Sequence, residues 1–226
     1  MIHDQPLVDA LLFLAVLLPS VILHEVAHGV VAERLGDPTA RRAGRITLNP
    51  IPHIDPVGSL AFPGFLALAG QPVWGWARPV PVQPGHFAHP TRGMAVTALA
   101  GPATNLALAL VIARLGPFVD LTSADPGRIA GYYPDLDIGL TTTSLGARVL
   151  FGAMVLNVAL AVFNMLPIPP LDGSRLVPLV LPEGARAAWM QFSQYGLLVL
   201  FLLLFVFRDA LAWIGDVLAV ILRLLV

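Results

Sequence analysis

Four long apolar segments constrain this chain more strongly than any other feature of its sequence. They run from Leu7 to about Val31, from Gly93 to Leu115, from about Leu145 to Leu166 and from about Ala187 to Phe207. Each approaches the ~20 residues that an α-helix needs to cross about 30 Å of bilayer hydrocarbon. Only 12% of the 226 residues are charged, about half the share in an average soluble domain. We therefore predict an all-α polytopic membrane protein.

Two shorter apolar stretches leave the number of transmembrane helices between about four and six. Val57 to Gly70 is broken by a Pro-Gly pair, which favours a re-entrant segment, and Ala210 to Val226 fits a short span or an interfacial helix. Arg45 to Asn49 alternates weakly and ends at a turn, so we predict a short strand there. With the extended stretch from Trp74 to Val82, this predicts a membrane-associated β-hairpin or re-entrant segment after the first helix.

We expect a single membrane-embedded domain over residues 1–226, because no internal repeat is visible. Its core would be residues 7–180, followed by C-terminal helices in 187–226 that could form a gate, a dimer surface or an anchor. The first apolar run lacks a preceding basic region, so we expect it to be retained rather than cleaved as a signal peptide.

The placement of arginine predicts the orientation in the membrane. Four arginines lie between residues 34 and 45, and Arg78 and Arg92 follow before the second span. By contrast, Gly116 to Ser144 holds only Arg128 beside four aspartates. The positive-inside rule therefore places the N-terminus outside and the loop at 32–92 in the cytoplasm.

The motif His24-Glu25-Val26-Ala27-His28 ends the first apolar run. On a helix, residues i and i+4 lie one turn apart on one face, so both imidazoles can bind one metal ion beside the glutamate. This is the usual arrangement for zinc with two histidine ligands and a glutamate general base. Because the chain contains no cysteine, such a site must use nitrogen and oxygen ligands.

A catalytic zinc site usually has three protein ligands, and Asp172 is the best candidate for the third. It follows the run from Asn164 to Leu171, where prolines break the helix and let a carboxylate turn inward. The predicted topology puts His24, His28 and Asp172 at similar depth, near the cytoplasmic side. Pro-Leu-Asp-Gly is also an ordinary turn in which aspartate caps a following helix. On the residues alone, both interpretations stay open.

Taken together, these motifs resemble those of the site-2 proteases, a family of intramembrane zinc metalloproteases. The matching residues are His24, Glu25 and His28 of H-E-x-x-H, Gly101, Pro102 and Asn105 of G-P-x-x-N, and Asn164, Pro167, Asp172 and Gly173 of N-x-x-P-x-x-x-x-D-G. The stretches from Gly44 to Gly58 and from Trp76 to Pro81 resemble the compact bacterial branch, and no PDZ or CBS domain is inserted. The resemblance covers residues 7 to 180.

The resemblance implies a multi-pass endopeptidase of the bacterial plasma membrane that cleaves transmembrane segments of membrane proteins, with its active site toward the cytoplasmic side. One zinc ion per chain would be held by His24, His28 and Asp172 and would lower the pKa of its water toward ~7. Glu25 would take the proton and pass it to the leaving amine. Asn164 would donate to the developing oxyanion or hold the substrate backbone.

The expected partners are a transmembrane protein substrate and membrane lipid. A helical substrate must unwind locally, and its extended segment could pair with the predicted strand at 45–49. The net charge of −1 gives no reason to expect nucleic acid. The identity of the substrate, the need for an earlier cut and the oligomeric state stay open.

Two alternatives belong to other functional classes: a catalytically silent relative that binds transmembrane segments, and a zinc transporter. The intact Glu25 argues against the first, and a single visible metal cluster argues against the second. For Gly101 and Asn105, we expect close helix packing and an interhelical hydrogen bond, respectively, more than direct substrate contact.

Overall fold

The computed structural model describes residues 6–68, 75–119, 145–211 and 213–225, and every regular element in these ranges is helical. The longer helices are α1 (Pro6–Arg34), α4 (Pro90–Val119), α6 (Leu145–Asn164), α8 (Glu183–Ser193) and α10 (Trp213–Leu225). The shorter ones are α2 (Thr39–Arg42), α3 (Phe62–Leu68), α7 (Val177–Val180) and α9 (Gly196–Phe201). Single helical turns or short helical segments occur at Ile51–His53, Pro56–Ala61, Pro84–His86, Asp172–Arg175, Leu202–Val206 and Arg208–Leu211.

Two of these helices are long and apolar enough to cross a membrane, Leu12–Arg34 and Pro90–Leu115. A third span results if α8 and the helix Gly196–Val206 are counted together. That pair is bent by 67°, so the fourth predicted segment is broken rather than continuous. In the part of the chain that the structure describes, the third predicted segment contributes the shorter apolar helix Val149–Asn164. The described residues form a helical fold with two or three candidate spans, which is consistent with a membrane protein, and the count of four to six stays a prediction.

The strand predicted at residues 45–49 is wrong. This segment forms successive bends, and no strand occurs anywhere in the described ranges. The side chains of its polar residues explain why, since Asn49 N–H donates to Thr47 Oγ1 and Ile51 N–H donates to Asn49 Oδ1. Local side-chain bonds of this kind compete with a strand ladder for the backbone groups. The predicted hairpin is not formed within the described residues, because residues 75–82, the described part of its other edge, form no strand either.

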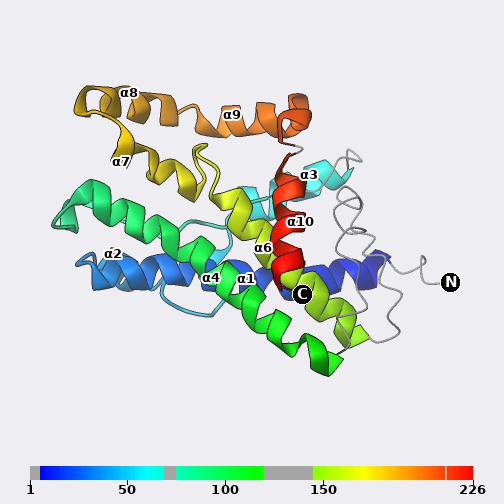
Figure 1. The fold of residues 1–226 in the computed structure, drawn as a ribbon. Helices are drawn as coiled ribbons and strands as arrows, with labels where there is room; N and C mark the ends of the chain where they lie inside the picture. The colour runs from blue at the N-terminus through cyan, green and yellow to red at the C-terminus, as the bar shows by residue number, and fades with distance from the viewer. Residues whose placement is uncertain (1–5, 69–74, 120–144, 212, 226) are drawn as a thin grey trace.

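Helices α1, α4 and α6 pack against one another and form the centre of the molecule (Figure 1). In this view α1 and α6 run from right to left, and α4 runs in the opposite direction. The C-terminal parts of α1 and α6 therefore lie toward the same end of the bundle. The arginine pattern predicts that the first and third apolar segments run in the same direction, which brings the H-E-x-x-H motif and Asp172 to similar depth. Helices α1 and α6 do run in the same direction.

Two apolar clusters connect the C-terminal helices to the rest of the molecule. In the first, Leu218 and Leu222 of α10 pack against Phe151 and Met154 of α6, together with Ala109 of α4. Because these side chains are buried, α10 stabilises the pairing of α4 with α6. In the second cluster, α9 packs on the loop after α6 through Leu166, Leu171 and Leu200. The C-terminal helices thus support the helical bundle and the loop that carries Asp172.

Candidate metal centre

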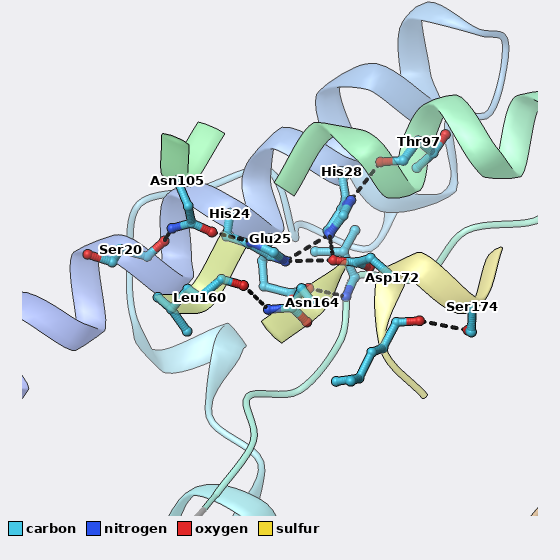
Figure 2. A network of polar contacts seen from close by, with 12 residues as sticks. Ser20, His24, Glu25, His28, Thr97, Asn105, Leu160, Asn164, Asp172 and Ser174 are labelled. Atoms are coloured by element: carbon cyan, nitrogen blue, oxygen red, sulfur yellow. Dashed lines mark hydrogen bonds and ion pairs between the residues drawn. The ribbon is translucent and has the colours of Figure 1, made fainter. Parts of the chain in front are cut away.

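Two histidines on α1 and one aspartate after α6 converge inside the bundle (Figure 2). His24 and His28 are 6% and 8% exposed, and their Nε2 atoms lie 3.0 Å apart. Oδ2 of Asp172 lies 3.0 Å from Nε2 of His24 and 3.3 Å from Nε2 of His28. The structure therefore brings together the three residues that the sequence predicts as metal ligands.

Hydrogen bonds at Nδ1 of each imidazole fix which nitrogen carries the proton. Nδ1 of His28 lies 2.7 Å from the main-chain carbonyl oxygen of Thr97, which can only accept. Nδ1 of His24 lies 2.5 Å from the side-chain oxygen of Asn105, which also only accepts. Both Nδ1 atoms must then donate, so in the neutral rings both Nε2 atoms direct lone pairs toward Asp172.

Three hydrogen-bond acceptors, and no donor among them, therefore meet at one point. Oδ2 of Asp172 is buried and has no hydrogen-bond partner within the described ranges. With both rings neutral, a cation placed between the three atoms would satisfy all of them. In a tetrahedral zinc site with metal–ligand bonds of about 2.0–2.1 Å, the ligand atoms lie about 3.3 Å apart. The separations of 3.0 to 3.3 Å in this cluster are close to that value, so the residues present fit a zinc ion.

The loop after α6 places Asp172 by folding back on the end of that helix. A Cβ at Gly173 would lie 2.2 Å from the carbonyl oxygen of Met165, so only glycine permits this close approach. Ser174 Oγ donates to Leu171 O at 2.6 Å and closes the turn in which Asp172 lies. Asp172 is the first residue of the short helix Asp172–Arg175, whose N-cap is Leu171, so it does not occupy the capping position, and its Oδ2 faces His24.

Helix α4 lies directly against the two imidazoles because residue 101 is glycine. A Cβ at Gly101 would lie 2.4 Å from Nε2 of His24 and 2.5 Å from Nε2 of His28, and real Cβ atoms essentially never show contacts under 3.0 Å. The close packing expected at Gly101 is therefore present, and it is packing against the candidate metal ligands themselves.

A buried polar network joins the three central helices and orients the Asn105 side chain. Asn105 Nδ2 donates to Asn157 Oδ1 at 2.8 Å, and Asn157 Nδ2 donates to Ser20 Oγ at 2.9 Å. All three residues are buried, and they lie on α4, α6 and α1. Because its nitrogen is bound in this way, Asn105 presents its oxygen to His24 (Figure 2). The interhelical hydrogen bond expected for Asn105 is confirmed.

Glu25 is held by a segment from elsewhere in the chain, residues 75–83, which we call the strap. Oε2 of Glu25 accepts a hydrogen bond of 2.8 Å from the N–H of Val80. The strap is anchored on both sides of this contact, because Arg78 N–H donates to His53 O at 2.8 Å and Gln83 N–H donates to Asp37 Oδ2 at 2.6 Å.

Asn164, the second residue predicted to act in catalysis, ends α6 near the cluster (Figure 2). Its Nδ2 donates to Leu160 O at 2.9 Å within its own helix. Among the described contacts it is not bonded to His24, His28 or Asp172. The structure thus places Asn164 beside the cluster without connecting it to the three ligands.

Comparison with known proteins identifies the family. The protein named "Putative zinc metalloprotease YwhC" of Bacillus subtilis is 39% identical over 191 residues, which cover 84% of this chain and 78% of that protein. "Peptidase family M50" matches residues 138–207, which contain Asn164 and Asp172. The chain belongs to this family.

Two mycobacterial proteins named "Putative zinc metalloprotease Rip2" are also similar to this M50 peptidase. The one from Mycobacterium tuberculosis H37Rv is 36% identical over 205 residues, 88% of this chain and 70% of that protein. The one from Mycolicibacterium smegmatis is 33% identical over 198 residues, 86% of this chain and 66% of that protein. No solved structure matches the chain significantly. Family and relatives agree that the protein is a metalloprotease.

Three contacts in this M50 peptidase were not predicted from the sequence. The carbonyl of Thr97 and the hydroxyl of Ser20 lie on helices whose packing register is not encoded in any local motif. The N–H of Val80 had a local signal: it lies between Pro79 and Pro81, so it is the one main-chain donor in a Pro-Val-Pro sequence.

Proposed function

We propose that this M50 peptidase is an intramembrane zinc endopeptidase that cleaves transmembrane segments of membrane proteins. The observation that carries the proposal is the convergence of Nε2 of His24, Nε2 of His28 and Oδ2 of Asp172, three acceptors without a donor, beside Glu25. In this proposal these three residues would hold one zinc ion per chain, and the bound ion would supply polarisation of the scissile carbonyl and a water with a pKa lowered to about 7.

The residues around the three ligands have separate roles in the proposed reaction. The Nδ1 bonds to Asn105 and Thr97 keep both imidazoles in the tautomer that binds a metal. The contact from Val80 orients Glu25 through Oε2, so its other oxygen, Oε1, is available to take a proton from water and return it to the leaving amine.

Asn164 is proposed to bind substrate at the edge of the cluster. One of its amide hydrogens is used in the bond to Leu160 O. The second can donate to the developing oxyanion or to the substrate backbone.

The membrane setting is supported by helices that remain apolar on their exposed faces. Val96, Leu106, Leu110 and Val111 of α4 are all exposed large apolar side chains. In water such a surface would be costly, whereas in lipid it is the expected one. We therefore place α1 and α4 across the bacterial plasma membrane, with the N-terminus outside and the active site toward the cytoplasmic side, as the arginine pattern predicts.

The experiment that tests this function compares Glu25→Gln with the wild type in proteoliposomes. The reporters are single-span proteins, one with a uniform leucine span and one with an Asn-Pro pair inside the span, because a helix must unwind before its carbonyls can be attacked. We expect the wild type to cut the second reporter within its span and to cut soluble casein far more slowly. Glu25→Gln should abolish cleavage and retain zinc.

The matched control is Glu33→Gln, which changes a glutamate on the same helix that pairs with Arg41 rather than with the cluster. This variant should cleave at the wild-type rate. Cleavage by Glu25→Gln at that rate would refute the assigned role of Glu25. Equal cleavage of casein and the unwound span would refute the preference for membrane segments.

A further inference from the structure

A second polar site lies beside the strap, away from the three candidate metal ligands. Here the strap and the preceding loop line an open cavity of about 290 Å³. Its walls carry two cations and no carboxylate; the lining residues are Ala43, Arg45, Pro52, Arg78, Pro79 and Pro81. A cavity with this lining favours an anion, because prolines offer no N–H donor and only the arginines can bind it.

Arg45 is buried without a direct ion pair to a carboxylate among the described residues. It is only 6% exposed, and Nε of its guanidinium has no hydrogen-bond partner among the described residues. Within the described ranges, the guanidinium of Arg45 makes one hydrogen bond, from Nη2 to the main-chain oxygen of Arg78. No ion pair of either arginine with a carboxylate occurs within the described part of the chain. Burial and the neighbouring charge of Arg78 lower the pKa of Arg45, and the charge of Glu25 offsets this only in part. A bound anion would offset the rest.

The surroundings of this cavity indicate the class of anion. Trp76 of the strap is 37% exposed and packs on Phe62, as a tryptophan at a membrane–water boundary would. The loop that carries both arginines lies on the side to which the positive-inside rule assigns the cytoplasm. Lipid phosphates are concentrated at that boundary, and the guanidinium fork matches the phosphate oxygens.

We propose that Arg45 and Arg78 form a binding site for a phosphate oxyanion, supplied either by an anionic phospholipid headgroup or by a soluble phosphate. The bound group contacts Pro79 and Pro81, while Val80 between them holds Glu25. Occupancy of the cavity therefore stabilises the strap that positions the catalytic glutamate. The site itself is independent of the proposed proteolysis, since its ligand does not take part in that reaction.

The test measures thermal unfolding of the full chain in dodecyl maltoside, a detergent without phosphate, by intrinsic tryptophan fluorescence. One arm adds inorganic phosphate against chloride at constant ionic strength. The other adds phosphatidylglycerol against an uncharged galactolipid. We expect a saturable rise of the melting temperature in at least one arm, and the arm in which it occurs identifies the source of the phosphate.

Arg78→Gln is the informative variant, because its side chain is exposed and its main-chain contacts to His53 and Arg45 do not need the guanidinium. Losing one of two charge-assisted contacts should weaken the apparent affinity by about tenfold or more. The control is Arg42→Gln, an exposed arginine that does not line the cavity and that should respond like the wild type. No rise in either arm, or an equal rise in Arg78→Gln and the wild type, would overturn the proposal.

Discussion

The substitution Gly101→Ala adds one methyl group to α4 at the point where this helix meets the metal ligands. The new Cβ would lie 2.4 Å from Nε2 of His24 and 2.5 Å from Nε2 of His28. Neither ring can withdraw easily, because Nδ1 of each is already bonded, to Asn105 and to Thr97 respectively. The helix or the rings must therefore move by more than half an ångström to restore an ordinary contact.

The size of the expected effect follows from which atoms are displaced. Both Nε2 atoms are proposed to bind zinc, and disturbing the groups that orient metal ligands typically lowers affinity about 10–100-fold. We expect Gly101→Ala to lose zinc affinity by at least this factor and to lose most proteolytic activity. Competition with a fluorescent chelator measures the first, and the single-span reporter measures the second.

A matched control separates this local effect from a general effect on helices. Gly146→Ala places a methyl group on α6, where a Cβ would meet nothing within 4 Å. Alanine favours a helix over glycine by up to about 1 kcal/mol, so this control should bind zinc normally and unfold no earlier than the wild type. If Gly101→Ala bound zinc with wild-type affinity, the contact between α4 and the imidazoles would be refuted.

Three further changes test other parts of the account. Asn105→Ala removes the acceptor for Nδ1 of His24 and should weaken zinc binding by about 10–100-fold in the chelator assay; unchanged affinity would contradict the tautomer argument. Burial would raise the pKa of Asp37, but bonds from Thr39 and Gln83 and the charge of His86 lower it overall. Its stabilisation is then complete above pH 3.8 and is lost as the pH falls through the lowered pKa, so Asp37→Asn and the wild type should differ at neutral pH and converge in acid. Melting curves that stay equally far apart at all pH values would exclude this. Met154→Ala opens a cavity in the cluster beneath α10 and should lower stability by about 2–5 kcal/mol while folded protein keeps its zinc; a loss below 1 kcal/mol would speak against a packed core there.

Much of the candidate centre was predictable because helical spacing fixes local geometry. His24 and His28 are one turn apart in any α-helix, so their common face follows from the sequence. The position of Asp172 was predictable for a different reason. The prolines that break the helix end and the arginine pattern together placed it at the same membrane depth as the two histidines. The family resemblance added to this, and the relatives identified the same class of enzyme.

The parts that sequence did not predict depend on side-chain competition and on packing. Residues 45–49 alternate like a strand, but Thr47 Oγ1 takes the N–H of Asn49, which a strand would use, and Asn49 Oδ1 takes the N–H of Ile51 just after it. The bend after Ser193 was missed because mean apolarity does not distinguish a straight helix from a bent pair. The bond from Val80 to Glu25 joins residues that are 55 positions apart, and it depends on how the strap crosses α1.

The zinc content of the purified protein tests the central claim most directly. Elemental analysis would be made on the wild type, on Asp172→Ala, and on Asp209→Ala as a control with an exposed aspartate outside the cluster. The account predicts about one zinc per chain in the wild type and in Asp209→Ala, as in other sites with three protein ligands, and little or none in Asp172→Ala. A wild type purified without zinc, or an Asp172→Ala variant that retains the full amount, would contradict it.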